Sequence, residues 1–252
     1  MTDRPARTGA ALVTGGARRI GRAICLRLAE AGFDIVIHHH ASADEADDLA
    51  GLIRAKGRRA ATVSADLTDE ASVKALVPAA VAALGPLQVL VNNASVFEDD
   101  RVGALERATW DRHIETNLRA PIVLSEAFAA QAGDGAAIVN LLDQRVLKPD
   151  PRFISYALSR NGLWWATRTL AQALAPKIRV NGVGPGPTLP SIHQTQADFD
   201  AEAQAVLLQK PGRPEAVADA VAWLVDADLV TGQMIAVDGG QHLAWRTPDI
   251  AE

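Results

Sequence analysis

The fold is decided by the stretch Ala10-Ala11-Leu12-Val13-Thr14-Gly15-Gly16-Ala17-Arg18-Arg19-Ile20-Gly21. Its first four residues are apolar and predict a buried strand, and residues 20–31 carry a helical period of apolar side chains. The glycines between the two segments permit a tight turn that aims backbone N–H groups at the amino terminus of a helix, where an anion is favoured. The turn is therefore either a site for nucleotide phosphates or a plain strand–helix connection.

Short apolar runs alternate with helical patterns along all 252 residues. Because strands that are covered on both faces are continuously apolar, these runs predict a parallel sheet with helices on both sides. No linker, repeat or change of composition divides the chain, so we expect one doubly wound, Rossmann-type α/β domain over residues 1–252. The expected strands are 10–13, 34–37, 60–63, 87–91, 136–142, 178–183 and 234–237; the expected helices are 20–31, 43–56, 69–84 (capped by Thr68), 106–131, 153–175 and 214–226.

Composition excludes several classes of protein. A net charge of −5 gives no general attraction to nucleic acid or to anionic membranes. Cys25 is the only cysteine, which excludes an intramolecular disulfide and a cysteine-rich zinc site. No run of 18 apolar residues predicts a membrane span, and the first ten residues are not followed by the apolar stretch of a secretory signal. We therefore expect a soluble, cytoplasmic protein.

The end of the second expected strand indicates which dinucleotide is preferred. Folds that select NAD commonly place a carboxylate about 20 residues beyond the glycines, but residues 38–42 read His-His-His-Ala-Ser, and the first acid is Asp44. Arg18 and Arg19 in the glycine turn add positive charge. This combination predicts NADPH rather than NADH, unless the arginines and histidines are solvated surface residues. A metal site is not expected from the three histidines, because adjacent side chains on a strand point to opposite faces.

Further landmarks follow in a fixed order. They are Asp66-Leu67, Asn92-Asn93-Ala94, Asn117, Tyr156 within Ser-Tyr-Ala-Leu-Ser-Arg, Pro185-Gly186 and Val237-Asp238-Gly239-Gly240. Each motif is weak alone, but together with the glycine turn they are similar to the short-chain dehydrogenase/reductase family over nearly the whole chain.

Several details resemble one branch of that family, the pteridine reductases. Arg19 stands where most members have glycine, and the segment 35–42 is similar to the histidine- and serine-containing segment of the branch. Ser95, followed by Val96 and Phe97, replaces the usual glycine after Asn-Asn-Ala. Asp143 stands at the position of the family's catalytic serine, and Thr188 where a phosphate-contacting serine is expected.

The resemblance implies which residues form the site. Hydride would leave NADPH while Tyr156 supplies a proton, with Asp143, Arg160 and Asn117 completing the catalytic set. Residues implied at the substrate are Arg19, Ser95, Phe97, Asp143 and Tyr156. Residues implied at the cofactor are Gly15, Arg18, Arg19, Ile20, Gly21, His38, His39, His40, Ser42, Asp66, Leu67, Asn93, Ala94, Ser95, Tyr156, Arg160, Pro185, Gly186 and Thr188.

Arg160 is the main departure from the family, which has lysine there. A fixed positive charge beside Tyr156 favours phenolate, so we expect the pKa of this tyrosine to lie below its usual value near 10. Arginine keeps the charge but has a planar, forked shape. Either Arg160 replaces the lysine with altered geometry, or the protein is a weakly active or inactive NADPH-binding sensor.

Alternatives remain open at three other residues. Asp143 either delivers a proton to a ring nitrogen of a pterin or braces the loop 144–150. Phe97 either stacks on a flat substrate or packs within its loop. Asn117 either holds a water that passes protons on or braces its helix.

These features favour reduction of a dihydropterin or dihydrofolate over reduction of a ketone or 3-oxoacyl thioester. Residues 188–210 would form the substrate loop. The surplus apolar face of the helix 153–175 predicts a homodimer or homotetramer.

Overall fold

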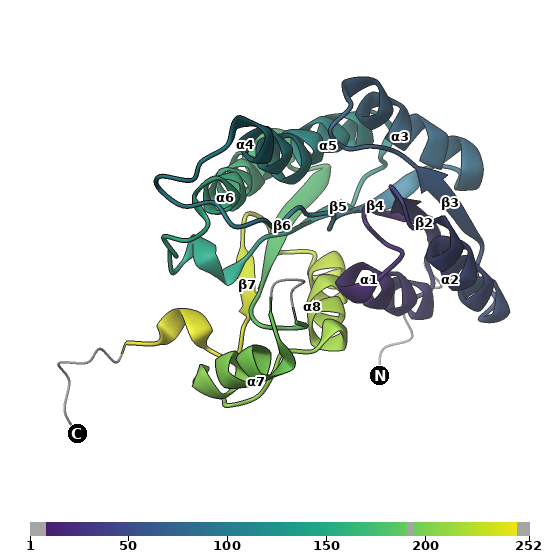
Figure 1. Cartoon of the computed structure of the whole chain (residues 1–252). Helices are drawn as coiled ribbons and strands as arrows, with labels where there is room; N and C mark the ends of the chain where they lie inside the picture. The colour runs from purple at the N-terminus through teal and green to yellow at the C-terminus, as the bar shows by residue number, and fades with distance from the viewer. Residues whose placement is uncertain (1–8, 191–193, 246–252) are drawn as a thin grey trace.

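The computed structural model describes residues 9–190 and 194–245 (Figure 1). Within these residues, seven strands form one sheet in the order β3-β2-β1-β4-β5-β6-β7, with every neighbouring pair parallel. The strands are β1 (Ala10–Val13), β2 (Asp34–His39), β3 (Ala60–Ser64), β4 (Leu87–Asn92), β5 (Ala136–Leu141), β6 (Ile178–Pro185) and β7 (Met234–Val237). The predicted parallel Rossmann-type sheet is thereby confirmed.

Helices cover both faces of this sheet (Figure 1). Along β1, Ala11 and Val13 pack into the apolar core under α1, α2 and α8, whereas Ala10 and Leu12 pack into the core on the opposite face. Successive side chains of a strand point to opposite faces of the sheet, and here both faces are buried. The strand is therefore apolar at every position. The longer helices are α1 (Arg19–Glu30), α2 (Ala43–Ala55), α3 (Glu70–Leu84), α4 (Arg107–Ile114), α5 (Ala120–Gln131), α6 (Ile154–Leu174), α7 (Gln196–Ala205) and α8 (Pro214–Asp226).

Two helical predictions were wrong in detail. The cap of α3 is Asp69, whose carboxylate accepts from the Ser72 N–H at 2.8 Å, and not Thr68. The expected helix 106–131 is interrupted by a π-helical segment, η1 (Glu115–Arg119), between α4 and α5. Pro121 has no N–H to donate to the carbonyl four residues earlier, and this lost bond accompanies the widened turn.

The region expected to form the substrate loop contains a helix that the sequence pattern did not predict. Helix α7 begins with a capping box, in which the Thr195 hydroxyl accepts from the Asp198 N–H and the Asp198 carboxylate accepts from the Thr195 N–H. In the described ranges, no helix is long and apolar enough to cross a membrane.

The parallel direction of the strands gathers the motifs that follow them at one edge of the sheet. The chain runs outward from β1 in two directions, to β2 and β3 on one side and to β4–β7 on the other. Ligands in open parallel sheets bind at the carboxyl ends of the strands, where the strand order reverses. The residues that follow β1, β4, β5 and β6 all lie at this edge.

Candidate active site

The glycine turn after β1 is bound to the end of β4. Asn93 Nδ2 donates to the carbonyls of Thr14 (2.8 Å) and Gly15 (3.1 Å), and Gly15 adopts φ +59°. A Cβ atom on Gly21 would lie 2.2 Å from the Gly15 carbonyl oxygen. Glycine at position 21 therefore lets the first turn of α1 pack directly on the loop.

His38 holds the glycine turn from the other side. Its Nδ1 accepts from the Gly15 N–H at 3.0 Å, and its Nε2 lies 3.1 Å from the Ala65 carbonyl oxygen. Burial lowers the pKa of His38 from 6.5 to about 4, with a smaller opposing effect from the Ala65 carbonyl. His38 is therefore neutral, with the proton on Nε2, and both ring nitrogens are already engaged by the backbone.

A cleft of about 630 Å³ lies above the glycine turn. Arg18 forms an exposed ion pair with Glu45 at 3.4 Å on its rim. Asp66 accepts from both the N–H and the hydroxyl of Thr68, and the backbone N–H bond lowers the pKa of this carboxyl most. Of the residues predicted at the cofactor, the cleft is lined by Gly15, Arg18, Arg19, Ile20, Gly21, His38, His39, His40, Ser42, Asp66, Leu67, Asn93, Ala94 and Ser95.

Arg19 connects the glycine turn with the start of the expected substrate loop. Its guanidinium donates to the Pro190 carbonyl at 3.0 Å through Nη1 and Nη2, and to the Leu189 carbonyl at 3.4 Å. Its φ of +52° lies in the left-handed region that favours glycine. This conformation explains why most members of the short-chain dehydrogenase/reductase family have glycine at this position.

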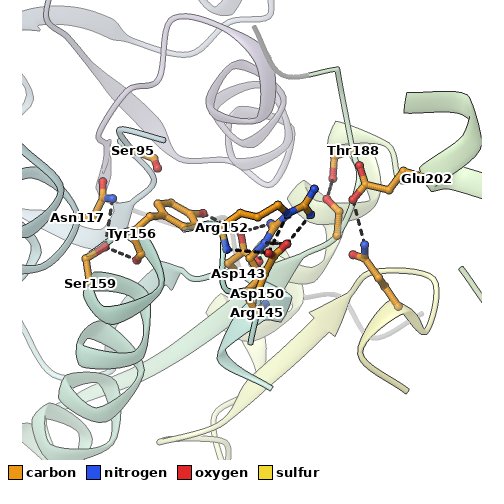
Figure 2. Close-up of polar contacts among 12 residues, drawn as sticks. Ser95, Asn117, Asp143, Arg145, Asp150, Arg152, Tyr156, Ser159, Thr188 and Glu202 are labelled. Atoms are coloured by element: carbon orange, nitrogen blue, oxygen red, sulfur yellow. Dashed lines mark hydrogen bonds and ion pairs between the residues drawn. The ribbon is translucent and has the colours of Figure 1, made fainter. Parts of the chain in front are cut away.

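Tyr156 and Asp143 meet between α6 and the carboxyl end of β5 (Figure 2). The Tyr156 hydroxyl donates to Asp143 Oδ2 at 2.7 Å, and both side chains are buried. Asp143 Oδ1 also accepts from the Arg145 N–H at 2.8 Å and caps the short 3-10 helix η2 (Gln144–Val146). The carboxylate thus braces its loop and contacts the tyrosine at once.

The expectation that the pKa of Tyr156 is lowered was wrong. Burial raises it above its ordinary value of 10, and the negative charge of Asp143 raises it further. Arg160 acts in the opposite direction, but its effect is smaller. The protein alone therefore holds Tyr156 as the neutral phenol, the form that can give a proton away.

Arg160 lies beneath the tyrosine with only 2% of its surface exposed. Its Nη1 donates to the Leu141 carbonyl at 2.9 Å, and its Cζ lies 5.4 Å from the centre of the Tyr156 ring. Among the described residues, its Nε is buried without a hydrogen-bond partner. The site thus contains a fixed positive charge with unused donor capacity.

Asn117, in the π-helical η1, braces the loop that follows β4. Its Oδ1 accepts from the Val96 N–H at 2.9 Å, while Nδ2 donates to the Val96 carbonyl at 2.8 Å and to Ser159 Oγ at 3.2 Å. The side chain is fully buried. Its amide is committed to these three contacts, which favours bracing over holding a water by the side chain.

Phe97 forms an aromatic cluster with Tyr156. Its ring centre lies 4.7 Å from that of Tyr156, edge to face, and 4.6 Å from that of Phe153. Phe97 is half-buried, whereas Ser95 is exposed and donates only to the Val96 carbonyl. Phe97 is therefore packed in place and still presents part of its surface.

Sequence reasoning missed a buried polar group behind Tyr156. Asp100 Oδ2 accepts from the Ser155 N–H at 2.8 Å and from the Ser155 hydroxyl. His113 Nδ1 lies 2.7 Å from the same hydroxyl, and its ring is 5.8 Å from that of Tyr156. These contacts fix the amino-terminal turn of α6, and their wide separation in the sequence left no local signal.

The chain at the end of β6 packs closely against the residue that follows β7. A Cβ on Gly186 would lie 2.6 Å from Asp238 Cα, so only glycine permits the close approach of the two segments. Thr188 is buried and donates to the Gly186 carbonyl at 3.0 Å. No group of three or more metal-binding side chains occurs within residues 9–190 and 194–245.

A parallel sheet with a glycine turn at the strand-order reversal, and a buried tyrosine beside a cation, defines a dinucleotide-dependent oxidoreductase site of the Rossmann class. Residues 15–242 match the family described as enoyl-(acyl carrier protein) reductase. A curated relative, the 3-oxoacyl-[acyl-carrier-protein] reductase FabG of Staphylococcus aureus, is 33% identical over 94% of this chain and 99% of its own. The chain belongs to this family, the short-chain dehydrogenases/reductases.

Solved structures narrow the resemblance. The FolM alternative dihydrofolate reductase 1 of Brucella canis, complexed with NADP, is 48% identical and has a TM-score of 0.94, covering 98% of each chain. A short-chain dehydrogenase of Burkholderia cenocepacia in complex with NADP is 35% identical, with a TM-score of 0.90 over 94% of this chain and 99% of its own. The predicted resemblance to the short-chain dehydrogenase/reductase family, and within it to the pteridine reductase-like branch, is confirmed.

Proposed function

We propose that the protein is an NADPH-dependent reductase of a pterin, converting a dihydropterin to a tetrahydropterin or reducing dihydrofolate. The contact between Tyr156 and Asp143 carries the proposal. A carboxylate at this position suits a substrate whose ring nitrogen must be protonated, whereas a ketone needs a proton only at its oxygen. The 48% identity to a FolM alternative dihydrofolate reductase supports it.

The residues of the cleft fit NADPH. The tight contact of Gly21 with the Gly15 carbonyl leaves the backbone of the turn open to a pyrophosphate at the amino terminus of α1. Arg18 would bind a 2′-phosphate, and Asp66 would accept from an adenine amino group; both residues line the cleft. Tyr156 and Arg160 would hold the nicotinamide ribose through the buried hydroxyl and the unpartnered Nε. NADPH supplies the hydride when it is bound.

The chain's own residues manage the proton. Reduction of a C=N bond adds a hydride to carbon and a proton to nitrogen, so one acid must stand at the nitrogen. Tyr156 is neutral in the protein and gives its proton, and Arg160 stabilises the phenolate that remains. Asp143 accepts the hydroxyl hydrogen bond before transfer, and afterwards it would pass a proton taken up from solvent to the phenolate. Phe97 presents a ring face to a flat substrate, and Arg19 and Ser95 border it.

A 3-oxoacyl or other carbonyl reductase is the second candidate. It is favoured by the 33% identity to the Staphylococcus aureus FabG over nearly the whole chain. A non-catalytic NADPH-binding protein is the third, and Arg160 is the observation that favours it. Asp143 separates the first two candidates, because only the first gives this carboxylate a role in proton supply.

We also propose that all 252 residues form one domain that assembles as a homodimer or homotetramer through α6. Trp165 is 64% exposed and Leu158 is 50% exposed on this helix, whereas Leu163 is buried inside the protein. Light scattering on the purified protein tests the assembly, and Trp165→Glu should shift it towards the monomer.

The test of function is consumption of NADPH followed by absorbance, with dihydropterins, dihydrofolate, small ketones and 3-oxoacyl thioesters offered in parallel. We expect turnover with the pterins and loss of that turnover in Tyr156→Phe, with NADPH binding retained. Turnover of the ketones or thioesters alone would move the assignment to the second candidate. Tight NADPH binding without any turnover would move it to the third.

A further inference from the structure

Arg145 contacts both oxygens of the Asp143 carboxylate. Its backbone N–H donates to Oδ1 at 2.8 Å, and its Nη1 lies 3.4 Å from Oδ1 and 3.3 Å from Oδ2. Oδ2 is the atom that accepts the Tyr156 hydroxyl. Arg145 and Tyr156 therefore both hold the carboxylate, and rotation of Asp143 would break both sets of contacts.

The guanidinium of Arg145 is held in place by two aromatic rings and a second carboxylate. Its Cζ lies 5.0 Å from the centre of the Phe153 ring and 5.6 Å from that of Phe97, a geometry that attracts a cation to both rings. Its side chain is only 17% exposed. On the outer side, its Nε lies 3.8 Å from Asp150 Oδ2, and Asp150 is itself held by Arg152 (Figure 2).

Four charged or titratable side chains face Tyr156. Asp143 follows β5 and caps η2, Arg145 lies in η2, Arg160 in α6 itself, and His113 in α4, where burial keeps the pKa of the imidazole below its usual value. Asp143 disfavours the phenolate form of Tyr156 and Arg160 favours it. The ion pair between Arg145 and Asp143, 3.3 Å long, offsets part of the unfavourable charge and leaves the favourable charge of Arg160 in place.

We propose that Arg145 is a positioning residue for proton transfer, which fixes the Asp143 carboxylate against the Tyr156 hydroxyl and offsets its charge so that Arg160 can stabilise the phenolate. The role in proton transfer rests on the proposed reductase function. The placement of Asp143 by Arg145 rests only on the contacts between the two residues and is independent of that function. The Tyr156 hydroxyl would turn its proton from Asp143 to the substrate nitrogen while NADPH supplies the hydride to the neighbouring carbon, and the electron pair of the broken O–H bond stays on the phenolate.

The sequence offers a direct probe, because Tyr156 is the only tyrosine in the chain. Protein labelled with 13C at tyrosine Cζ gives a single resonance, whose position follows the hydrogen bond and the charge at that hydroxyl. Arg145→Gln removes the charge, and Arg145→Lys keeps the charge without the fork. Arg101→Gln is the matched control, because Arg101 is exposed and pairs only with Asp99 in the contacts described.

We expect the resonance to move or split in Arg145→Gln, to move less in Arg145→Lys, and to stay in place in Arg101→Gln. With a pterin substrate, kcat should fall about tenfold in Arg145→Gln at an unchanged NADPH Kd, since a charge-assisted contact is lost. Circular dichroism and NADPH binding establish that each variant is folded. An Arg145→Gln protein with the wild-type resonance and kcat would overturn the proposal.

Failure of the proposed function has a different signature. If wild-type protein turns over no pterin, the reductase assignment fails, and the resonance still decides whether Arg145 positions Asp143. A moved resonance in Arg145→Gln would then support the placement, and an unmoved one would refute it.

Discussion

Protonation of His38 should destabilise the fold in a defined pH window. The folded protein binds this proton only near pH 4, because the ring is buried and its Nδ1 already accepts the Gly15 N–H, whereas an unfolded histidine binds it near pH 6.5. Stability from neutral His38 is therefore complete above about pH 6.5 and is lost as the pH falls towards 4. A pH of about 5 is roughly 1.5 units below the pKa of His38 in the unfolded chain. At about 1.36 kcal/mol per unit, the free energy of unfolding is then lower by about 2 kcal/mol.

The assay is urea unfolding, followed by tryptophan fluorescence at about pH 7.5 and about pH 5. His38→Gln keeps a donor for the Ala65 carbonyl but no longer titrates. Its free energy of unfolding should be lower than wild type at the higher pH by about 1 kcal/mol, through loss of the acceptor for Gly15. The drop on acidification should then be smaller than in wild type by about 2 kcal/mol.

His40→Gln is the control, because His40 is exposed at the end of the same segment. It should lose as much stability on acidification as wild type does. Equal acid sensitivity in wild type and His38→Gln would refute the assignment of a neutral, backbone-bound His38.

Three further substitutions test the cofactor site and the cation under Tyr156. Arg18→Ala should weaken NADPH binding about tenfold and leave NADH binding nearly unchanged in a fluorescence titration; equal losses for both cofactors would contradict a 2′-phosphate contact. Gly21→Ala should lower Tm and NADPH affinity, because the new Cβ would lie 2.2 Å from the Gly15 carbonyl oxygen. Gly51→Ala is the control: its Cβ would have no atom within 4 Å, so it should stabilise α2 by about 0.5–1 kcal/mol. Unchanged Tm and NADPH affinity in Gly21→Ala would contradict the close contact between Gly21 and the Gly15 carbonyl. Arg160→Lys should change kcat by less than about tenfold, and activity found only in the variant would show that arginine does not replace the lysine of the family.

The sheet was predictable because its signal is local. Each buried parallel strand is a continuous apolar run, as in Ala10–Val13, and the glycine turn marks where the first helix begins. The helix α7 was missed because the polar segment around it shows no clear apolar face, and its start depends on the capping pair Thr195 and Asp198. The π-helical interruption at Asn117 was missed because a helical period does not register one widened turn.

The family resemblance predicted which residues lie at the candidate site but not the hydrogen-bond partners of those residues. His38 bonds to Gly15 and Ala65, which lie 23 and 27 residues away, and no spacing rule connects the three. The predicted direction of the Tyr156 pKa shift was wrong, because burial of the side chain raises this pKa more than the nearby Arg160 lowers it. Burial is a property of the packed fold and cannot be seen in the local sequence. Arg145 drew no attention in the sequence, because its significance lies in reaching back to a carboxylate two residues earlier.

We propose that Asp143 beside Tyr156 makes the site a pterin reductase. The most direct measurement is kcat/KM of wild type and Asp143→Ser with a dihydropterin and with a 3-oxoacyl thioester, using NADPH. We expect the substitution to lower the value for the pterin by about 10²-fold or more, as for loss of a general acid–base group, and to leave that for the thioester equal or higher. Unchanged pterin reduction in Asp143→Ser, with activity still abolished in Tyr156→Phe, would contradict the claim.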